Sequence, residues 1–384
     1  MKNVNIVACK RSAIGRFGGG LKSFSPTDLA AAIAEAVVPE ALRSDVEQVI
    51  FGQVMQAGSG MNVARQTGWK LGLPEATPAF TVNMVCGSSL KAVALGADAI
   101  RLGDNELVLT GGVEVMSRAP HYAMDSRWGK KLGNITLQDS LILDGLSDAM
   151  LNIGMGETAE RIAEKFGISR PDQDAFAARS QQLAAEHRTK FEREIVPVSG
   201  RDGTIQEDEH PRADTTSESL AKLKPSFRKD GTVTAGNSSG INDGAAMVLL
   251  ASDEAVTRLD LTPIARVVAT AVVGCDPALM GLGPVEAIHA VCRRAKWDLR
   301  DVDAIEINEA FAAQLLGCAQ LLNLDTAKLN QRGGAIALGH PIGASGARVL
   351  TTLIHLMEDQ GYRKGIASLC IGGGMGIAMA IESD

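Results

Sequence analysis

Cys86 of this 384-residue sequence lies where a nucleophile is expected. It belongs to the segment NMVCGSS, residues 83–89, in which a strand-like stretch changes into a helix rich in small residues. A sharp turn there would expose the sulfur, and a helix N-terminus would lower the thiol pKa below its ordinary value of about 8.5. The alternative is a buried cysteine that only fills space in the core.

His340 is the second candidate, in the segment GHPIG, residues 339–343. The residue before a proline is held extended, so this histidine cannot belong to a regular helix. An imidazole carried on a loop could take the proton of Cys86 and so activate it. The alternative is an exposed loop histidine with no chemical role.

Cys370 opens the glycine-rich segment CIGGGMG, residues 370–376. These glycines let the backbone approach a ligand and leave N–H groups free to bind an oxyanion. A dinucleotide-binding loop is disfavoured, because neither a helix nor an acidic residue follows at the required distance. The alternative for Cys370 is a core residue of a strand.

Asn308 follows the strand-like residues 304–307. Its amide could donate to a developing negative oxygen, or hold a water that does so. The commoner task of an asparagine in this place is to cap the next helix, and Asn308 alone would favour that interpretation.

The elements that position these residues repeat along the chain. Residues 45–52 and 301–308 each place a short acidic turn before a half-buried strand, and each copy later reaches a glycine-punctuated loop, with Cys86 in one and His340 in the other. A small-residue helix and a strand ending in glycines then follow, at 90–102 and 107–112 in the first copy and at 347–357 and 365–374 in the second. This recurrence predicts two related α/β halves. Because the two helices carry small residues around most of their circumference, we expect them to be buried between sheets, in a layered sandwich.

A polar segment separates the two halves. Residues 117–242 hold most of the charged runs, and helices are expected at 158–166 and 170–191. We interpret this segment as an excursion from the first half that lies over the active site. A strand at 248–252 is expected to close the first half.

Composition excludes several classes of function. The net charge of −7 and pI near 5.5 argue against a nucleic-acid-binding surface, and no apolar run is long enough for a membrane span. The N-terminal residues predict a strand rather than a signal peptide, so a cytoplasmic protein is expected. The six cysteines form no CxxC pair and no metal-type cluster with histidine, which predicts free thiols and no metal or cofactor.

Four short blocks combine the candidate residues. They are N-x-x-C-x-S at 83–88, N-E-A-F at 308–311, G-H-P-x-G-x-S-G-x-R at 339–348 and C-x-G-G-G-x-G at 370–376. With the further segments 9–15 and 231–237, they resemble the thiolase family along the whole chain. The resemblance implies a five-layered αβαβα sandwich. It also implies an N-terminal half of residues 1–116 and 243–262, a loop domain of 117–242 and a C-terminal half of 263–384.

The resemblance also implies a division of labour. Cys86 would accept the acyl group as a thioester, and His340, with a water held by Asn308, would activate Cys86 and bind the enolate oxygen. Cys370 would move the proton of the nucleophilic carbon or of the coenzyme A sulfur. Backbone N–H groups of Cys86 and Gly372 would form a second oxyanion hole. The implied reaction is the Claisen condensation of two acetyl-CoA to acetoacetyl-CoA, and its reverse thiolysis.

Substrate contacts are implied in the same way. The residues expected to contact coenzyme A in the loop domain are Arg212, Ser219, Leu223, Phe227, Ala235 and Ser239. Those expected nearer the pantetheine and acyl group are Met155, Met280, Ala310 and Phe311. Acyl-CoA and coenzyme A are the expected partners, as substrates and products, and a homodimer or homotetramer is expected.

Three alternatives stay open. Many acetoacetyl-specific members carry His-Met-Gly where this chain has GMG at 154–156, which leaves a 3-ketoacyl-CoA thiolase of fatty-acid β-oxidation as an alternative. A ketoacyl synthase should lack the second catalytic cysteine, so Cys370 argues against it. A non-catalytic lipid-binding relative is disfavoured by the intact set of reactive residues. Fast alkylation of one cysteine by iodoacetamide, with protection by acyl-CoA, would favour the enzyme over this binding protein.

Overall fold

The two halves of the chain have the same strand order. The computed structural model describes residues 2–201 and 203–383, so the outermost residues of the predicted domain ranges lie outside it. The first half runs β4 (Ala79–Val82), β3 (Gln48–Gly52), β5 (Leu107–Val115), β13 (Asn242–Ala251) and β1 (Asn5–Ser12) across its sheet. The second half runs β15 (Ala304–Ile307), β16 (Lys364–Ile371), β17 (Met375–Glu382) and β14 (Ala265–Gly274).

Strand directions match as well. The pairs β3–β5 and β15–β16 are parallel, whereas the next two pairs of each half are antiparallel. Leu329 forms an isolated parallel bridge with Ile305, at the place that β4 takes beside β3 in the first half. The strands β1 and β14 pair and join the two halves into one continuous sheet. The duplication predicted from the sequence is therefore present in the topology.

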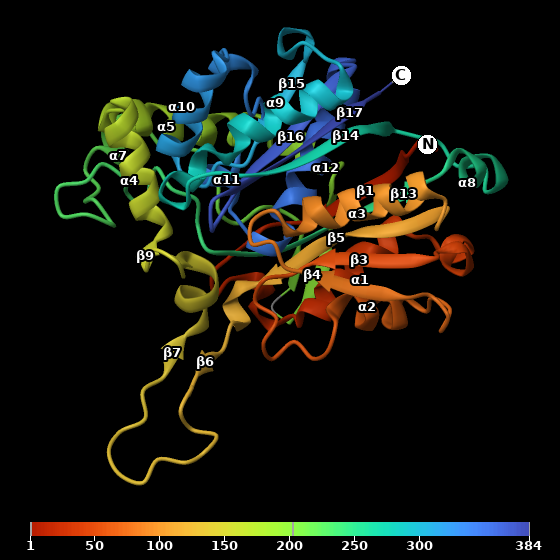
Figure 1. Cartoon of the computed structure of the whole chain (residues 1–384), viewed down its shortest axis with the longest axis horizontal. Helices are drawn as coiled ribbons and strands as arrows, with labels where there is room; N and C mark the ends of the chain where they lie inside the picture. Colours follow the sequence, from red (N-terminus) through yellow and green to blue (C-terminus); the bar gives the residue numbers. More distant parts are fainter. Residues whose placement is uncertain (1, 202, 384) are drawn as a thin grey trace.

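Helices complete five layers (Figure 1). Two central helices, α3 (Ser88–Leu102) and α12 (Ser345–Gln360), share one apolar core with strands of both halves. The outer helices α1 (Pro26–Val37) and α2 (Val63–Leu71) cover the first half. The outer helices α9 (Gly283–Ala295) and α10 (Ala312–Leu322) cover the second. The predicted αβαβα sandwich with buried central helices is confirmed.

Close approach of the central helices explains their small residues. A Cβ added to Gly346 of α12 would lie 2.5 Å from the backbone nitrogen of Leu90 in α3. A Cβ added to Gly96 of α3 would lie 2.6 Å from the Thr110 side chain of β5. Larger side chains would force the layers apart, so the sandwich needs glycine at both positions.

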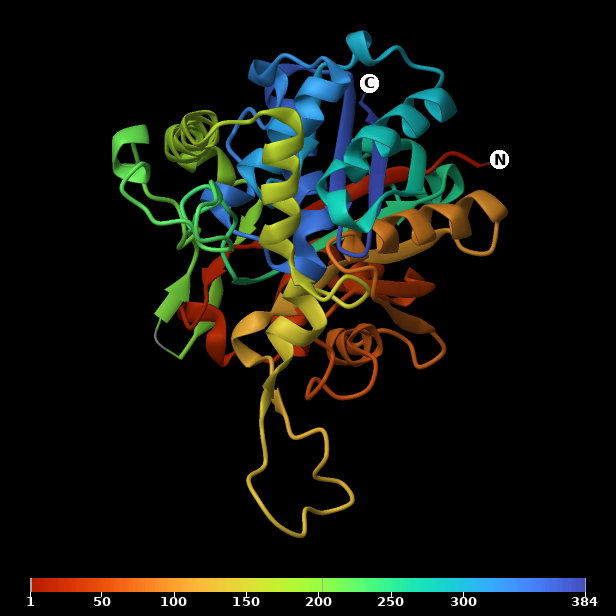
Figure 2. The same cartoon turned by 60° about the vertical axis from the view of Figure 1, so that its left-hand side comes forward.

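The intervening segment packs against one end of the sandwich and includes a projecting arm (Figure 2). Its helices are α4 (Met155–Phe166), α5 (Arg170–Glu186), α6 (Arg188–Phe191) and α7 (Ser217–Leu220). Its short strands are β6 (His121–Tyr122), β7 (Gln138–Asp139), β8 (Ser147–Asp148), β9 (Ile153–Gly154), β10 (Ile195–Val196), β11 (Val198–Gly200) and β12 (Gly203–Ile205). The remaining short elements are β2 (Gly15–Arg16), α8 (Asp253–Arg258) and α11 (Ala335–Leu338). The domain boundaries at 116, 242 and 262 stay predictions.

Several predicted elements differ in extent from the observed ones, and two of these differences have a clear physical cause. The single helix expected over 170–191 is wrong, because the chain leaves the helical conformation at His187, whose ψ is 14°, and divides into α5 and α6. The strand expected at 248–252 begins earlier, at Asn242, because it pairs with β5 from Asp243 onward. Within residues 2–201 and 203–383, no helix combines the length and hydropathy that a membrane crossing requires.

Candidate active site

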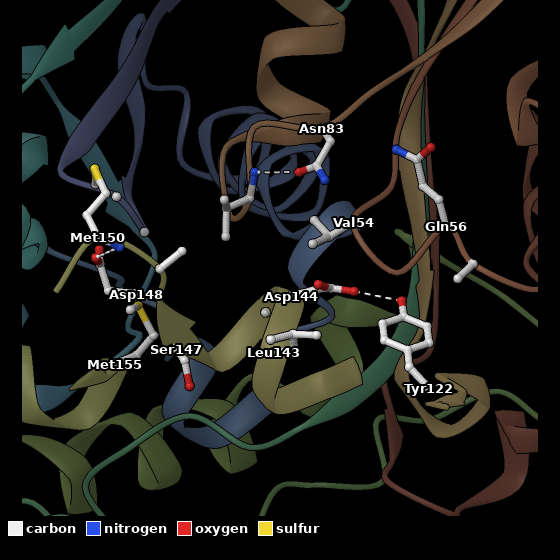
Figure 3. Close-up of a pocket in the computed structure, with 16 residues that line it drawn as sticks. Val54, Gln56, Asn83, Tyr122, Leu143, Asp144, Ser147, Asp148, Met150 and Met155 are labelled. Atoms are coloured by element: carbon white, nitrogen blue, oxygen red, sulfur yellow. Dashed lines mark hydrogen bonds between the residues drawn. The ribbon is translucent and has the colours of Figure 1, made fainter. Parts of the chain in front are cut away.

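Cys86 lies on a strained turn between β4 and α3. The preceding Val85 has a φ of 45°, which a β-branched residue rarely adopts. The Asn83 side chain accepts the Val85 backbone N–H at 3.0 Å (Figure 3), and the Ser88 hydroxyl donates to the Val85 carbonyl at 2.7 Å. These bonds hold a conformation that would otherwise relax, as expected of a nucleophile elbow.

Three side chains from separate elements meet at this turn. The Nε2 atom of His340 lies 3.4 Å from the Cys86 sulfur, and the Nδ2 atom of Asn308 lies 3.5 Å from the same Nε2. Asn308 directly follows β15, and His340 lies on the loop before α12, so both come from the second half. The structure therefore brings together the cysteine of one half and the histidine and asparagine of the other.

Ser345 sets the protonation of the imidazole. Its hydroxyl lies 2.8 Å from the Pro341 carbonyl, to which it donates, and 2.6 Å from Nδ1 of His340. Having one proton to donate, the hydroxyl accepts the Nδ1–H of the ring. The other nitrogen, Nε2, then carries a lone pair toward the Cys86 thiol. Ser345 belongs to the sequence block 339–348, but no role was predicted for it. Its place five residues after His340 was the signal available.

The acidity of Cys86 differs from the sequence-based prediction. Burial raises the pKa of the Cys86 thiol to about 11, although backbone N–H groups of Gly372 and of Cys86 itself act in the opposite direction. Burial, with the positive charge of Arg348, lowers the pKa of His340 to about 3. The expected lowering by the helix N-terminus is therefore wrong for the free protein, because desolvation outweighs it. The resting pair is a neutral thiol beside a neutral imidazole.

These pKa values predict an unusual pH dependence. A histidine of ordinary pKa would lose its ability to accept the thiol proton as the pH falls through about 6.5. The lowered pKa of His340 moves this loss to about pH 3. We therefore expect the rate of Cys86 acylation, measured by rapid mixing with acetyl-CoA, to show no inflection between about pH 5.5 and 8. A tenfold fall per pH unit below 6.5 would contradict the assignment.

Cys370 and Gly372 approach Cys86 from the end of β16. Cys370 is fully buried, and burial together with the charge of Cys86 raises its pKa well above the ordinary value. Burial thus keeps the Cys370 thiol protonated in the free protein. The Gly372 backbone N–H is directed at the Cys86 sulfur. The backbone N–H groups of Gly372 and Cys86 therefore both lie near this sulfur, and their task as an oxyanion hole stays a prediction.

A cavity of about 540 Å³ opens beside this cluster (Figure 3). Val85, Met155 and Gly372 line it on the side of Cys86. Across the cavity, the Tyr122 hydroxyl donates to Asp144 at 2.6 Å. Cys86 itself does not line the cavity, but its neighbour Val85 does.

Most of the predicted substrate-binding residues form one continuous band. Met155, Met280, Ala310 and Phe311 share an apolar cluster with Cys370. The Phe227 ring meets the Phe311 ring edge-on at 6.0 Å and leads outward to the surface. The members at the surface end are Leu223, Ala235 and Ser239. Leu223 lies beside Gly236, and Ala235 is exposed. The backbone N–H of Ser239 donates to the Ala310 carbonyl.

Arg212 and Ser219 are not members of the apolar cluster around Cys370. Arg212 is exposed, and its backbone N–H donates to Gln181 at 2.7 Å. Ser219 has a local structural task, because it forms a capping box with Thr216 at the start of α7. Contact of either residue with coenzyme A stays a prediction.

Glu114 is a buried carboxylate that sequence reasoning missed. It accepts backbone N–H groups of Val54, Met55 and Gly343 at 2.9 to 3.0 Å. Burial nevertheless raises its pKa to about 7. Because Gly343 follows His340 by three residues, Glu114 ties the histidine loop to the cavity wall. An acidic residue at the end of the apolar strand 107–115 was the signal available.

Comparison with known proteins identifies the family. The family described as "Thiolase, N-terminal domain" matches residues 4–254, and "Thiolase, C-terminal domain" matches residues 261–383. This chain is a thiolase. The acetyl-CoA acetyltransferase of Chromobacterium violaceum is 51% identical to the thiolase over 99% of each chain.

Solved structures agree over the full length of the thiolase. The Bacillus anthracis acetyl-CoA acetyltransferase is 43% identical, with a TM-score of 0.95, covering 100% of this chain and 99% of the other. Human mitochondrial 3-ketoacyl-CoA thiolase in complex with CoA is 43% identical, with a TM-score of 0.97, covering 100% and 98%. The thiolase is thus an acyltransferase, while the roles of its individual side chains stay predictions. Among the described residues, no group of His, Cys, Asp and Glu is arranged to hold a metal ion.

Proposed function

We propose that this thiolase condenses two acetyl-CoA to acetoacetyl-CoA and catalyses the reverse thiolysis through an acyl-Cys86 intermediate. The contact between the Cys86 sulfur and the unprotonated Nε2 of His340, at 3.4 Å, carries this proposal. The names of full-length relatives at about half identity support acetyl-CoA as the substrate. Coenzyme A is a substrate and product here, and the reaction needs no metal or prosthetic group.

In the first half-reaction, Cys86 becomes acylated. His340 Nε2 takes the thiol proton as the sulfur attacks the thioester carbonyl, and the carbonyl oxygen develops charge toward the N–H groups of Cys86 and Gly372. Collapse of this intermediate releases coenzyme A thiolate, which takes the proton of Cys370. Cys370 becomes a thiolate, and His340 keeps on Nε2 the proton that it received from Cys86. A neutral imidazole suits this step, since a protonated one could not accept.

In the second half-reaction, Cys370 as its thiolate removes the α-proton of a second acetyl-CoA. The enolate oxygen lies near His340 and Asn308, whose N–H donors stabilise it. The enolate carbon attacks the acyl-Cys86 carbonyl, the carbon–sulfur bond to Cys86 breaks, and Cys86 regains its proton from His340 Nε2, while Cys370 keeps the α-proton. Thiolysis follows the same path in reverse.

Acetoacetyl-CoA is the proposed preferred substrate of thiolysis. Gly154 leaves room, because a Cβ built there would meet only the Leu146 carbonyl, at 3.9 Å. Gly154 directly precedes Met155, which lines the cavity, so we expect the missing histidine side chain to let some longer chains be accepted.

A thiolysis profile tests the proposal. The ratio kcat/KM, measured over 3-ketoacyl-CoA substrates of increasing length, is expected to be highest for acetoacetyl-CoA. A maximum at a medium or long chain would favour a β-oxidation enzyme instead. Absence of any coenzyme A-dependent cleavage, with acyl-CoA still bound, would favour the non-catalytic binding protein.

We further propose a homodimer or homotetramer in the cytoplasm. Edge strand β4 pairs only with β3 among the described strands, and Phe80 on it is exposed, so a second copy could pair there. The loop 123–137 of the arm exposes large apolar residues, including Trp128 and Leu132, which supports further assembly. The six cysteines, all in described residues, are free, as a reducing compartment requires. Sedimentation velocity measures the assembly, and a monomer would exclude it.

A further inference from the structure

Arg348 is a buried cation beside the site with no part in the proposed reaction steps. It lies on α12, only 2% exposed, and closes the sequence block that contains His340. Its Nη2 donates to Oδ1 of Asn308 at 3.4 Å. It therefore contacts the carboxamide on the side opposite to His340.

The orientation of this carboxamide decides what Asn308 can do. Its two ends are a donor and an acceptor, and a half-turn exchanges them. Only with Nδ2 toward His340 does Asn308 present an N–H to the place where the enolate oxygen would form. With Oδ1 there instead, a lone pair would face a negative oxygen and destabilise it.

A guanidinium permits only one of these orientations. It has donors and no acceptor, so it binds Oδ1 and would clash with Nδ2. We propose that Arg348 is a positioning residue that holds the Asn308 carboxamide with its N–H toward the thioester site. This proposal rests on the proposed function, in which Asn308 stabilises the enolate.

The surroundings explain why a charge is kept at this depth. Glu306 precedes Asn308 by two residues, so both side chains point to the same face of β15. Burial disfavours the charged form of Arg348, and the negative charge of Glu306 is the largest influence that opposes this. Glu194 and Glu309 act with Glu306, whereas Arg11 acts against them. Burial also raises the pKa of Glu306 to about 8, so its stabilisation of the cation that orients Asn308 increases as the pH rises and Glu306 loses its proton.

A second buried arginine provides a matched control. Arg332 is 1% exposed, and its Nε and Nη1 lack protein partners, as do those of Arg348. Its Nη2, however, donates to Asp359 rather than to Asn308. Loss of Arg332 should therefore cost stability without altering the orientation of Asn308.

The experiment combines Arg348→Met and Arg348→Lys with Asn308→Ala and Arg332→Met. We expect R348M to lower kcat of condensation by about 10² with little change in KM, as for loss of one oxyanion donor. R348K keeps a cation but lacks the planar guanidinium, so we expect it to lower kcat about tenfold. In the N308A background, neither change should lower kcat further, because the group being oriented is gone. R332M should lower Tm and leave kcat within about twofold.

Each outcome decides the proposal. If R348K lowers kcat equally with and without Asn308, Arg348 acts through general structure and the proposal is overturned. The lysine variant keeps this test available should R348M fail to fold. Full activity of N308A would overturn both this proposal and the role of Asn308. An unmodified chain that exchanges no acetyl groups would overturn the proposed function itself, which separates the two failures.

Discussion

Replacing Cys86 by alanine is expected to abolish condensation and thiolysis together. Both directions pass through the same acyl-Cys86, and no other thiol lies at 3.4 Å from the His340 Nε2 among the described residues. Where a nucleophile and its base act together, loss of the nucleophile typically lowers kcat by about 10⁶-fold. Coenzyme A release from acetyl-CoA and cleavage of acetoacetyl-CoA, each followed spectroscopically, measure the two directions.

A second cysteine–histidine contact supplies the control for this change. The sulfur of Cys9 lies 3.9 Å from Nε2 of His355, but burial raises its pKa to about 12 and no glycine-rich loop adjoins it. Cys9→Ala should keep activity within a few-fold while lowering stability, as small core truncations do. Retained turnover in C86A, or equal loss in C9A, would reject Cys86 as the nucleophile.

The sequence predicted the meeting of Cys86, His340 and Asn308 because their positions repeat in two copies of one unit. It could also predict a layered sandwich with buried central helices, since small residues around α3 and α12 allow close packing on both sides. The number of five layers came from the family resemblance.

Acidity could not be predicted in this way. A pKa depends on how much protein surrounds the titrating group. At Cys86, desolvation raises the pKa by more than the helix N-terminus lowers it. Only the helix N-terminus can be recognised from a sequence motif. The roles of Ser345 and Glu114 depend on hydrogen bonds of 2.6 and 2.9 Å to His340 and Gly343. The periodicity of the sequence does not show that these residues are partners. The strained φ of Val85 is likewise set by tertiary contacts rather than by its residue type.

Replacing Cys370 by alanine is expected to separate the two half-reactions. Acylation of Cys86 uses His340 as base, so C370A should still form the acyl-enzyme from acetyl-CoA. Removal of the α-proton needs a base near Cys86, and the loss of a positioned base typically costs about 10²–10⁴ in rate. Mass spectrometry of the protein measures acylation, and deuterium entry into acetyl-CoA in heavy water measures proton removal.

Coupling between the two thiols gives this prediction a further consequence. The charge of Cys86 is the second largest cause, after burial, that raises the pKa of Cys370. Cys86 rests as a neutral thiol, however, so this charge is absent from the free protein near neutral pH. In the proposed reaction Cys370 instead loses its proton to the departing coenzyme A thiolate, which makes it a thiolate in the acyl-enzyme but not in the free protein. Deuterium entry should therefore accelerate once Cys86 is acylated. Cys318→Ala serves as control, since this buried thiol also raises the pKa of Cys370 but donates to the Gly281 carbonyl. Normal deuterium entry in C370A would assign the α-proton to another base.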